Sequence, residues 1–250
     1  MARAQSMVGI TIAPLGEPAA AVAWAASRGI RGIQWSATQA GMRPRELGGS
    51  ARRDIRALFV RHEMVLSGVD AIVPSAHLID PRHAERAIDA IRGACEFAAD
   101  LGHAAVTVQL PAPDDVAASQ EARRSLIDAL VAAADRTGVS LADLAGAALA
   151  PSPPVGVAID PAALLAEGTD PAMAVSQAGA RLASARIVDL LRSGMRGPVG
   201  RGPEARLDLL AYRVALGVSG FAGLPVVDCR QWADPRAGAE ASLAAWAEVG

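Results

Sequence analysis

Short segments rich in β-branched and other apolar residues alternate along the chain with longer segments rich in alanine and arginine. The short segments predict strands, at residues 8–13, 30–35, 65–72, 105–110, 155–159, 185–188 and 224–227, with an eighth at 139–144. The longer segments predict amphipathic helices, at residues 17–28, 51–62, 81–101, 120–136, 171–182 and 204–216. Because strands alternate with helices, we expect parallel strands joined by helical crossovers.

Two α/β architectures fit this alternation. A doubly wound sheet would bind a nucleotide at a glycine-rich first turn, but the first turn here reads APLGEP and lacks the G-x-G-x-x-G pattern. A (β/α)8 TIM barrel needs about 250 residues and no such turn. The chain has 250 residues and no linker or break in composition. The sequence therefore predicts one TIM-barrel domain over residues 1–250.

Capping residues mark the starts of two of the predicted helices. Ser50 precedes the segment ARRDIRALFV, and Asp80 stands immediately before Pro81. Serine and aspartate cap helix N-termini, and proline is favoured in the first helical turn. Both patterns predict helices that begin directly after Ser50 and Asp80.

The composition excludes several function classes. Lys+Arg total 24 and Asp+Glu total 26, so the net charge of −2 gives no basic surface for nucleic acid. The chain contains no lysine at all, which rules out Schiff-base chemistry and a pyridoxal phosphate (PLP) lysine, and the missing glycine motif argues against NAD. We expect no membrane span and no signal peptide, because apolar runs are short, and hence a cytoplasmic protein.

Acidic and histidine residues at the ends of predicted strands are the candidate catalytic groups. Asp160 ends the segment VGVAID, and Asp228 follows LPVV, with no helix start directly after it. His77 lies in the loop after the third strand. Active sites of TIM barrels lie at the C-terminal ends of the strands. We therefore predict catalytic roles for all three, although Asp160 also has the pattern of a helix cap.

Four further residues are candidates for binding substrate. Gln34 and Trp35 end the second strand, Gln109 ends the fourth, and Arg230 follows Asp228. The amides could bind hydroxyl groups, the indole could stack on a sugar, and the guanidinium could anchor an anionic or hydroxylated ligand. For each of them, ordinary packing or a structural hydrogen bond is the alternative interpretation.

Several longer segments resemble the sugar phosphate isomerase/epimerase family. They are GIQWSATQAGMRPREL, SARRDIRALFVRHEMVLSGVDAIVPSAHLIDP, ADLGHAAVTVQLP, VGVAIDPAALLAEGTDP and GFAGLPVVDCRQWADP. The resemblance implies a xylose isomerase-like TIM barrel and a site for a divalent metal. It also implies a Glu on strand five, an Asp on strand six, a His near strand seven and a Glu on strand eight as metal ligands.

The chain departs from that implied ligand set. Leu144 stands at the position of the first Glu, Ser184 at about the position of the His, and Asp228 at that of the second Glu. Only Asp160 and Asp228 remain as metal ligands. We therefore predict that Mn²⁺, Mg²⁺ or Zn²⁺ binds weakly or not at all.

Two functions remain open. The resemblance implies a metal-assisted isomerase or epimerase acting on a sugar or polyol, and retained Asp160, Asp228 and His77 favour it. The depleted ligand set favours a catalytically degenerate barrel that binds a small molecule or a protein partner. The expected partner is a small sugar-like molecule, and neither nucleic acid nor a membrane.

Overall fold

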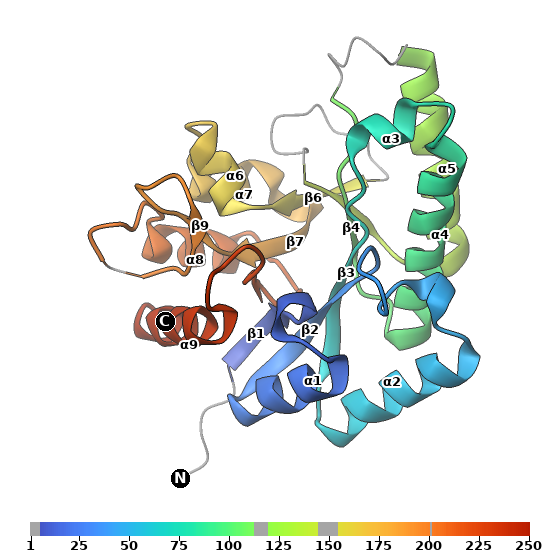
Figure 1. Cartoon of the computed structure of the whole chain (residues 1–250). Coiled ribbons are helices and arrows are strands. Elements are labelled where there is room, and N and C mark those ends of the chain that lie inside the picture. The colour runs from blue at the N-terminus through green and yellow to red at the C-terminus, as the bar shows by residue number, and fades with distance from the viewer. Residues whose placement is uncertain (1–5, 113–119, 145–154, 201) are drawn as a thin grey trace.

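The computed structural model describes residues 6–112, 120–144, 155–200 and 202–250. Eight parallel strands close into a barrel in the order β1-β10-β7-β6-β5-β4-β3-β2, and helices surround it (Figure 1). The closed barrel confirms the predicted (β/α)8 fold and excludes the doubly wound sheet. The alternation of strand and helix patterns, together with the chain length and the absence of a glycine-rich first turn, therefore identified the architecture.

The barrel strands lie where the sequence predicts them. They are β1 (Ser6–Thr11), β2 (Ile30–Ser36), β3 (Val65–Asp70), β4 (Val106–Val108), β5 (Leu141–Asp143), β6 (Val155–Ile159), β7 (Leu182–Ile187) and β10 (Val226–Val227). The strand that was expected to begin at residue 185 begins at Leu182 instead. A short antiparallel hairpin follows it, formed by β8 (Asp189–Leu190) and β9 (Arg196–Gly197).

Helices cover the outside of the barrel (Figure 1). They are α1 (Pro18–Ser27), α2 (Gly49–Arg61), α3 (Ser75–Ile79), α4 (Ala84–Leu101), α5 (Gln120–Thr137), α6 (Pro161–Ala166), α7 (Pro171–Ala178), α8 (Leu209–Val218) and α9 (Pro235–Glu248). Short 3-10 turns are η1 (Ala13–Leu15), η2 (Pro44–Glu46) and η4 (Gly179–Arg181). Within the described residues, no helix is both long and apolar enough to span a bilayer.

Both predicted helix starts are wrong. Helix α2 begins at Gly49, so Ser50 lies inside its first turn and caps nothing. Helix α4 begins only at Ala84, and in the turn before it the carboxylate of Asp80 accepts the backbone N–H of Arg82 and pairs with its guanidinium at 2.7 Å. Asp80 therefore stabilises a turn between α3 and α4 rather than a helix terminus.

The barrel interior is polar toward the C-terminal ends of its strands. Along β2 the buried Gln34 alternates with the buried apolar residues Ile33 and Trp35, and successive strand residues face opposite sides of a sheet. Other buried polar or charged residues on the barrel strands or directly after them are Thr11, Asp70, Thr107, Asp143, Asp160, Ser184, Arg186 and Asp228. Such residues need partners when they are removed from water, and Gln34, Asp70, Arg186 and Asp228 supply some of them to one another.

Candidate functional site

A buried arginine lies in the interior of the barrel. Arg186, on β7, is 1% exposed. Its Nη2 donates to Asp70 Oδ1 at 2.6 Å, and its Nη1 donates to Asp228 Oδ2 at 3.1 Å. Strands β3 and β7 are separated on both sides by other strands of the closed barrel. The guanidinium therefore joins strands across the barrel as well as to the neighbouring β10.

The register of β7 places Arg186 level with the predicted acid of β6. Ile159 pairs with Ala185 in the parallel ladder between β6 and β7, so the next residues, Asp160 and Arg186, lie side by side. Ser184 pairs with Ala158, deeper in the barrel. The position beside Asp160 is therefore held by Arg186, whereas Ser184, which sequence matching put at about the position of the family's His, lies two residues earlier on the strand.

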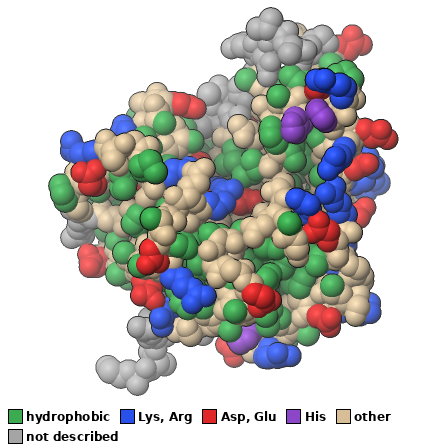
Figure 2. Space-filling model, in the orientation of Figure 1, with side chains coloured by type: hydrophobic (Ala, Val, Ile, Leu, Met, Phe, Trp, Pro, Cys, Tyr) green, Lys and Arg blue, Asp and Glu red, His purple; other side chains and the backbone are tan. Residues whose placement is uncertain are grey.

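Two further arginines cover the same carboxylates from the rim. Arg196, on β9, donates to Asp160 Oδ1 at 3.0 Å and to Asp228 Oδ2 at 2.9 Å. Arg230 donates from Nη2 to Asp228 Oδ2 at 2.6 Å and lies 3.4 Å from Asp70 Oδ2. We call these six residues, three arginines and three aspartates of balanced charge, the mouth network: Asp70, Asp160, Arg186, Arg196, Asp228 and Arg230. Figure 2 shows basic and acidic side chains side by side in the middle of this face.

The hairpin β8–β9 and helix α8 hold this network in place. Asp189, on β8, is buried and accepts the backbone N–H groups of Arg206 and Leu207 at 3.0 and 2.9 Å. Burial raises the pKa of Asp189, which those two hydrogen bonds partly oppose. The hydroxyl of Tyr212, on α8, donates to the carbonyl oxygen of Arg186 at 2.9 Å. The Tyr212 contact fixes the backbone of Arg186, and the Asp189 contacts fix residues 206 and 207 against the hairpin that carries Arg196.

The arginines and aspartates of the network keep one another in the charged form. Burial by itself would raise the pKa of Asp228, but Arg186, Arg230 and Arg196 hold it well below its usual range. Burial would lower the pKa of Arg186, but the carboxylates of Asp70, Asp228 and Asp160 raise it above its usual value. Neither group exchanges a proton near neutral pH, so neither is poised as a general acid or base.

The low pKa of Asp228 predicts a loss of stability in acid. An unfolded aspartate has a pKa of about 3.9, so the stabilisation of the folded carboxylate is fully present above about pH 4 and is lost as the pH falls further. We expect the free energy of unfolding, measured with urea, to fall more steeply below about pH 4 in the native chain than in Asp228→Asn, which cannot titrate there. Equal slopes in the two proteins would contradict this expectation.

The structure brings four of the predicted site residues together. Asp160, Asp228 and Arg230 belong to the mouth network, and Gln34 adjoins it through a hydrogen bond from Nε2 to Asp70 Oδ1 at 2.8 Å. Asp160 is also the cap of α6, because its Oδ1 accepts the N–H of Ala163 at 3.3 Å. The structural and the functional interpretations of Asp160 are thus compatible.

Three other predicted residues lie apart from the network. Trp35 is 1% exposed, donates to the carbonyl oxygen of Met42 at 2.8 Å and packs on Phe97 of α4, so it lies between barrel and helices. Gln109 is exposed just beyond β4. His77 is exposed on α3, with its ring 4.8 Å from that of His83. We leave these three out of the proposed mouth site.

The sequence analysis missed Asp70, Arg186 and Arg196. Asp70 ends the strand segment VLSGVD and had the same strand-end signal as Asp160 and Asp228. Arg186 was visible as a charged residue inside an apolar strand, which requires a buried partner. Arg196 had no local signal, because its position depends on the hairpin that follows β7.

One buried polar atom of the network and one next to it have no partner among the described residues. They are Gln34 Oε1 and Arg186 Nε. An acceptor and a donor without partners are costly in an apolar interior and are available to water or to a ligand. The mouth therefore offers hydrogen-bonding capacity beyond its internal ion pairs.

The residues at the mouth do not fit a divalent metal. Among the described residues there is no group of three or more His, Cys, Asp or Glu side chains arranged to hold one. The carboxylates of Asp160 and Asp228 both face arginine, which supplies positive charge where a cation would bind. A metal ion would have to displace these guanidinium groups and would be repelled by Arg186.

Comparisons with known proteins agree with the fold. Residues 22–143 match the family model of the xylose isomerase-like TIM barrel. A xylose isomerase domain protein from Planctomyces limnophilus is 16% identical, with a TM-score of 0.75 over 98% of this chain and 96% of the other.

Two further crystal structures are similar to the same extent. A sugar phosphate isomerase/epimerase from Parabacteroides distasonis is 12% identical, with a TM-score of 0.70 over 97% and 94% of the chains. A D-psicose 3-epimerase with D-tagatose, from Clostridium cellulolyticum, is 15% identical, with a TM-score of 0.74 over 96% and 97%. Among curated proteins, none matches the sequence.

Proposed function

Because this chain has the TIM-barrel fold and its residues 22–143 match the xylose isomerase-like model, we propose that it binds a small sugar-like ligand at the mouth of the barrel and that arginine, rather than a metal, organises the site. The observation that carries the proposal is the guanidinium of Arg186, which lies beside Asp160 and pairs with Asp70 and Asp228. This function corresponds to a barrel that keeps the fold of sugar isomerases and epimerases while its metal site is replaced.

The rim supplies groups that suit an acidic sugar. The side chains of Arg196 and Arg230 are 20% and 29% exposed, so they can reach a ligand from solvent while they pair with the acids below. Each guanidinium has five N–H donors in a planar fork that suits a carboxylate. Gln34 Oε1, next to the network, is a buried acceptor that has no partner among the described residues. We therefore propose a sugar acid, such as a uronate or an aldonate, as the ligand class.

A sugar isomerase or epimerase is the second candidate. The observation that favours it is the pair of carboxylates, Asp160 and Asp228, retained after β6 and β10. Proton transfer at carbon would require one of them to be a base of suitable pKa. The arginines around Asp228 hold its pKa low, which favours binding over this chemistry.

Titration calorimetry tests the proposal with two ligands, D-glucuronate and D-fructose. Each is measured in two separate buffers, one with excess EDTA and one with added Mn²⁺. We expect glucuronate to bind equally well in both conditions, and Arg196→Gln to weaken it about tenfold or more, as loss of a charged hydrogen bond does. Arg192→Gln is the matched control, because Arg192 is an exposed arginine of the same hairpin outside the network.

Two outcomes would overturn the proposal. If neither sugar bound, the proposal that the barrel mouth binds a sugar-like ligand would be wrong. Binding or epimerisation that needs Mn²⁺ would establish the isomerase candidate instead. Turnover is followed by chromatography of the sugars after incubation with the protein.

A further inference from the structure

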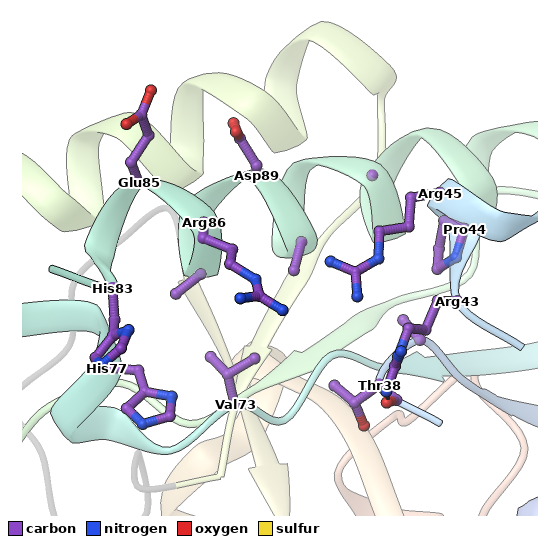
Figure 3. A pocket seen from close by; sticks show the side chains of 14 residues that line it. Thr38, Arg43, Pro44, Arg45, Val73, His77, His83, Glu85, Arg86 and Asp89 are labelled. Atoms are coloured by element: carbon purple, nitrogen blue, oxygen red, sulfur yellow. Dashed lines mark hydrogen bonds between the residues drawn. The ribbon is translucent and has the colours of Figure 1, made fainter. Parts of the chain in front are cut away.

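A pocket lies apart from the mouth network, on the side of β2 and β3. It has a volume of about 710 Å³ and is formed by residues that follow β2 and β3, by η2 and by the first half of α4. Figure 3 shows its lining side chains. None of the mouth-network residues lines this pocket. It therefore calls for an explanation of its own.

Basic side chains surround the pocket. Arg43, Arg45 and Arg86 line it together with His77 and His83. In Figure 3 the side chains of Arg45 and Arg86 extend toward the open space between α4 and η2, and the two histidines lie at one end. The pocket thus gathers three guanidinium and two imidazole groups from four separate segments.

The three arginines differ in what they already bind. Arg43 is held by the carbonyl oxygen of Thr38 at 3.0 Å and by Glu46 Oε1 at 3.1 Å. Within the part of the chain that the structure describes, Arg45 and Arg86 make no side-chain hydrogen bond or ion pair shorter than 4.0 Å. Their N–H donors remain available to an anion.

The acidic residues of the pocket do not neutralise these donors. Glu85 and Asp89, on α4, point away from Arg86 and out of the pocket in Figure 3. Asp89 is paired instead with Arg92, one turn further along the same helix, at 2.7 Å. The charge that faces the interior of the pocket is therefore positive.

One wall of the pocket is apolar. Val73 lies opposite the helix in Figure 3, and Ala37, Ala87 and Ala90 also line the space. A bare inorganic anion would leave this wall exposed to water. A ligand that carries a small organic group on its anion would bury it, which is favourable.

We propose that this pocket binds a small phosphomonoester, with the phosphate held by Arg45 and Arg86 and the organic group against Val73 and the alanines. Arginine suits a phosphate because its planar fork makes two parallel hydrogen bonds to it. His77 adds a donor at the end of the pocket. The inference rests on residues outside the mouth network and does not depend on the function proposed for it.

Titration calorimetry with phenyl phosphate and with inorganic phosphate tests this inference. We expect phenyl phosphate to bind the native chain more tightly than inorganic phosphate does. Arg86→Gln and Arg45→Gln should each raise its Kd about tenfold or more, as expected when a charged hydrogen-bond donor is lost. Arg56→Gln is the matched control, because Arg56 is an exposed arginine on α2 that does not line the pocket, and it should leave Kd within about twofold.

Each alternative result would overturn a defined part of the inference. Equal affinity for phenyl phosphate and inorganic phosphate would show that the organic group contributes nothing to binding. Unchanged phenyl phosphate binding in both Arg45→Gln and Arg86→Gln would show that this pocket is not the binding site. Arg196→Gln, which alters only the mouth, should leave phenyl phosphate binding unchanged. If that variant abolished binding, phosphate would bind at the mouth and not in this pocket. Circular dichroism of each variant verifies that it is folded.

Discussion

Replacement of Arg186 by methionine is expected to lower the free energy of unfolding by about 3–5 kcal/mol, the range typical for breaking a buried ion pair from one side. Methionine fills a similar volume but leaves the carboxylates of Asp70 and Asp228 facing each other without the central cation. Two buried carboxylates without that partner repel each other and lack the solvation of water. Urea unfolding followed by circular dichroism measures the loss.

A compensated variant separates charge from packing. The triple variant Asp70→Asn, Arg186→Met, Asp228→Asn has no uncompensated buried carboxylates. We therefore expect it to recover a large part of the stability that Arg186→Met alone loses. Arg31→Met is the surface control, since its partner Glu63 is 73% exposed, and it should cost at most about 1 kcal/mol. If Arg186→Met cost no more than Arg31→Met, Arg186 would not be the electrostatic centre of the barrel.

Replacing arginine by metal ligands is expected to convert the mouth into a metal site. The variant Leu144→Glu, Arg186→His, Arg196→Gln removes two of the guanidinium groups that face Asp160 and Asp228. It adds an imidazole and a carboxylate as further metal ligands. Mn²⁺ accepts such a mixed shell. At 100 times its Kd, Mn²⁺ would raise the free energy of unfolding by about 2.7 kcal/mol. We expect thermal and urea unfolding to show this stabilisation in the variant and not in the native chain.

The control for this conversion places the histidine where sequence matching put it. Ser184→His, combined with Leu144→Glu and Arg196→Gln, keeps Arg186 beside Asp160 and adds the imidazole one layer deeper. We expect no stabilisation by Mn²⁺ in that protein. Stabilisation of both variants to the same extent would show that the register of β7 does not determine the ligand position. Stabilisation of the native chain by Mn²⁺ would contradict the proposal that arginine has replaced the metal at the mouth.

The candidate site was only partly predictable, and particular residues show why. Asp160 and Asp228 could be found because an acid directly after an apolar strand lies at one end of any parallel barrel. Trp35 had the same strand-end signal but faces the helices, because neighbouring residues of a strand alternate between two faces. The sequence position of Gln109 likewise could not show that its side chain is exposed.

The sequence by itself determined the architecture. Apolar strand segments separated by helical ones specify parallel strands with crossovers, and the chain length suits eight of them. These are local properties, since each strand or helix is encoded by its own residues. For that reason each predicted strand and helix overlaps an element of the structure, while start points differ, as at Ser50, at Asp80, at the strand expected from residue 185 and at the helix expected from residue 204.

Only the tertiary structure decided what occupies the mouth. Arg186 and Asp70 are 116 positions apart in the chain, and their 2.6 Å hydrogen bond exists because the barrel closes and places β3 across from β7. Arg196 reaches Asp160 only because a hairpin folds back over the rim. Such contacts depend on strand register and closure, which no local pattern encodes. The chain's composition allowed either a metal site or an ion-pair network, and the register of β7 placed a guanidinium beside Asp160.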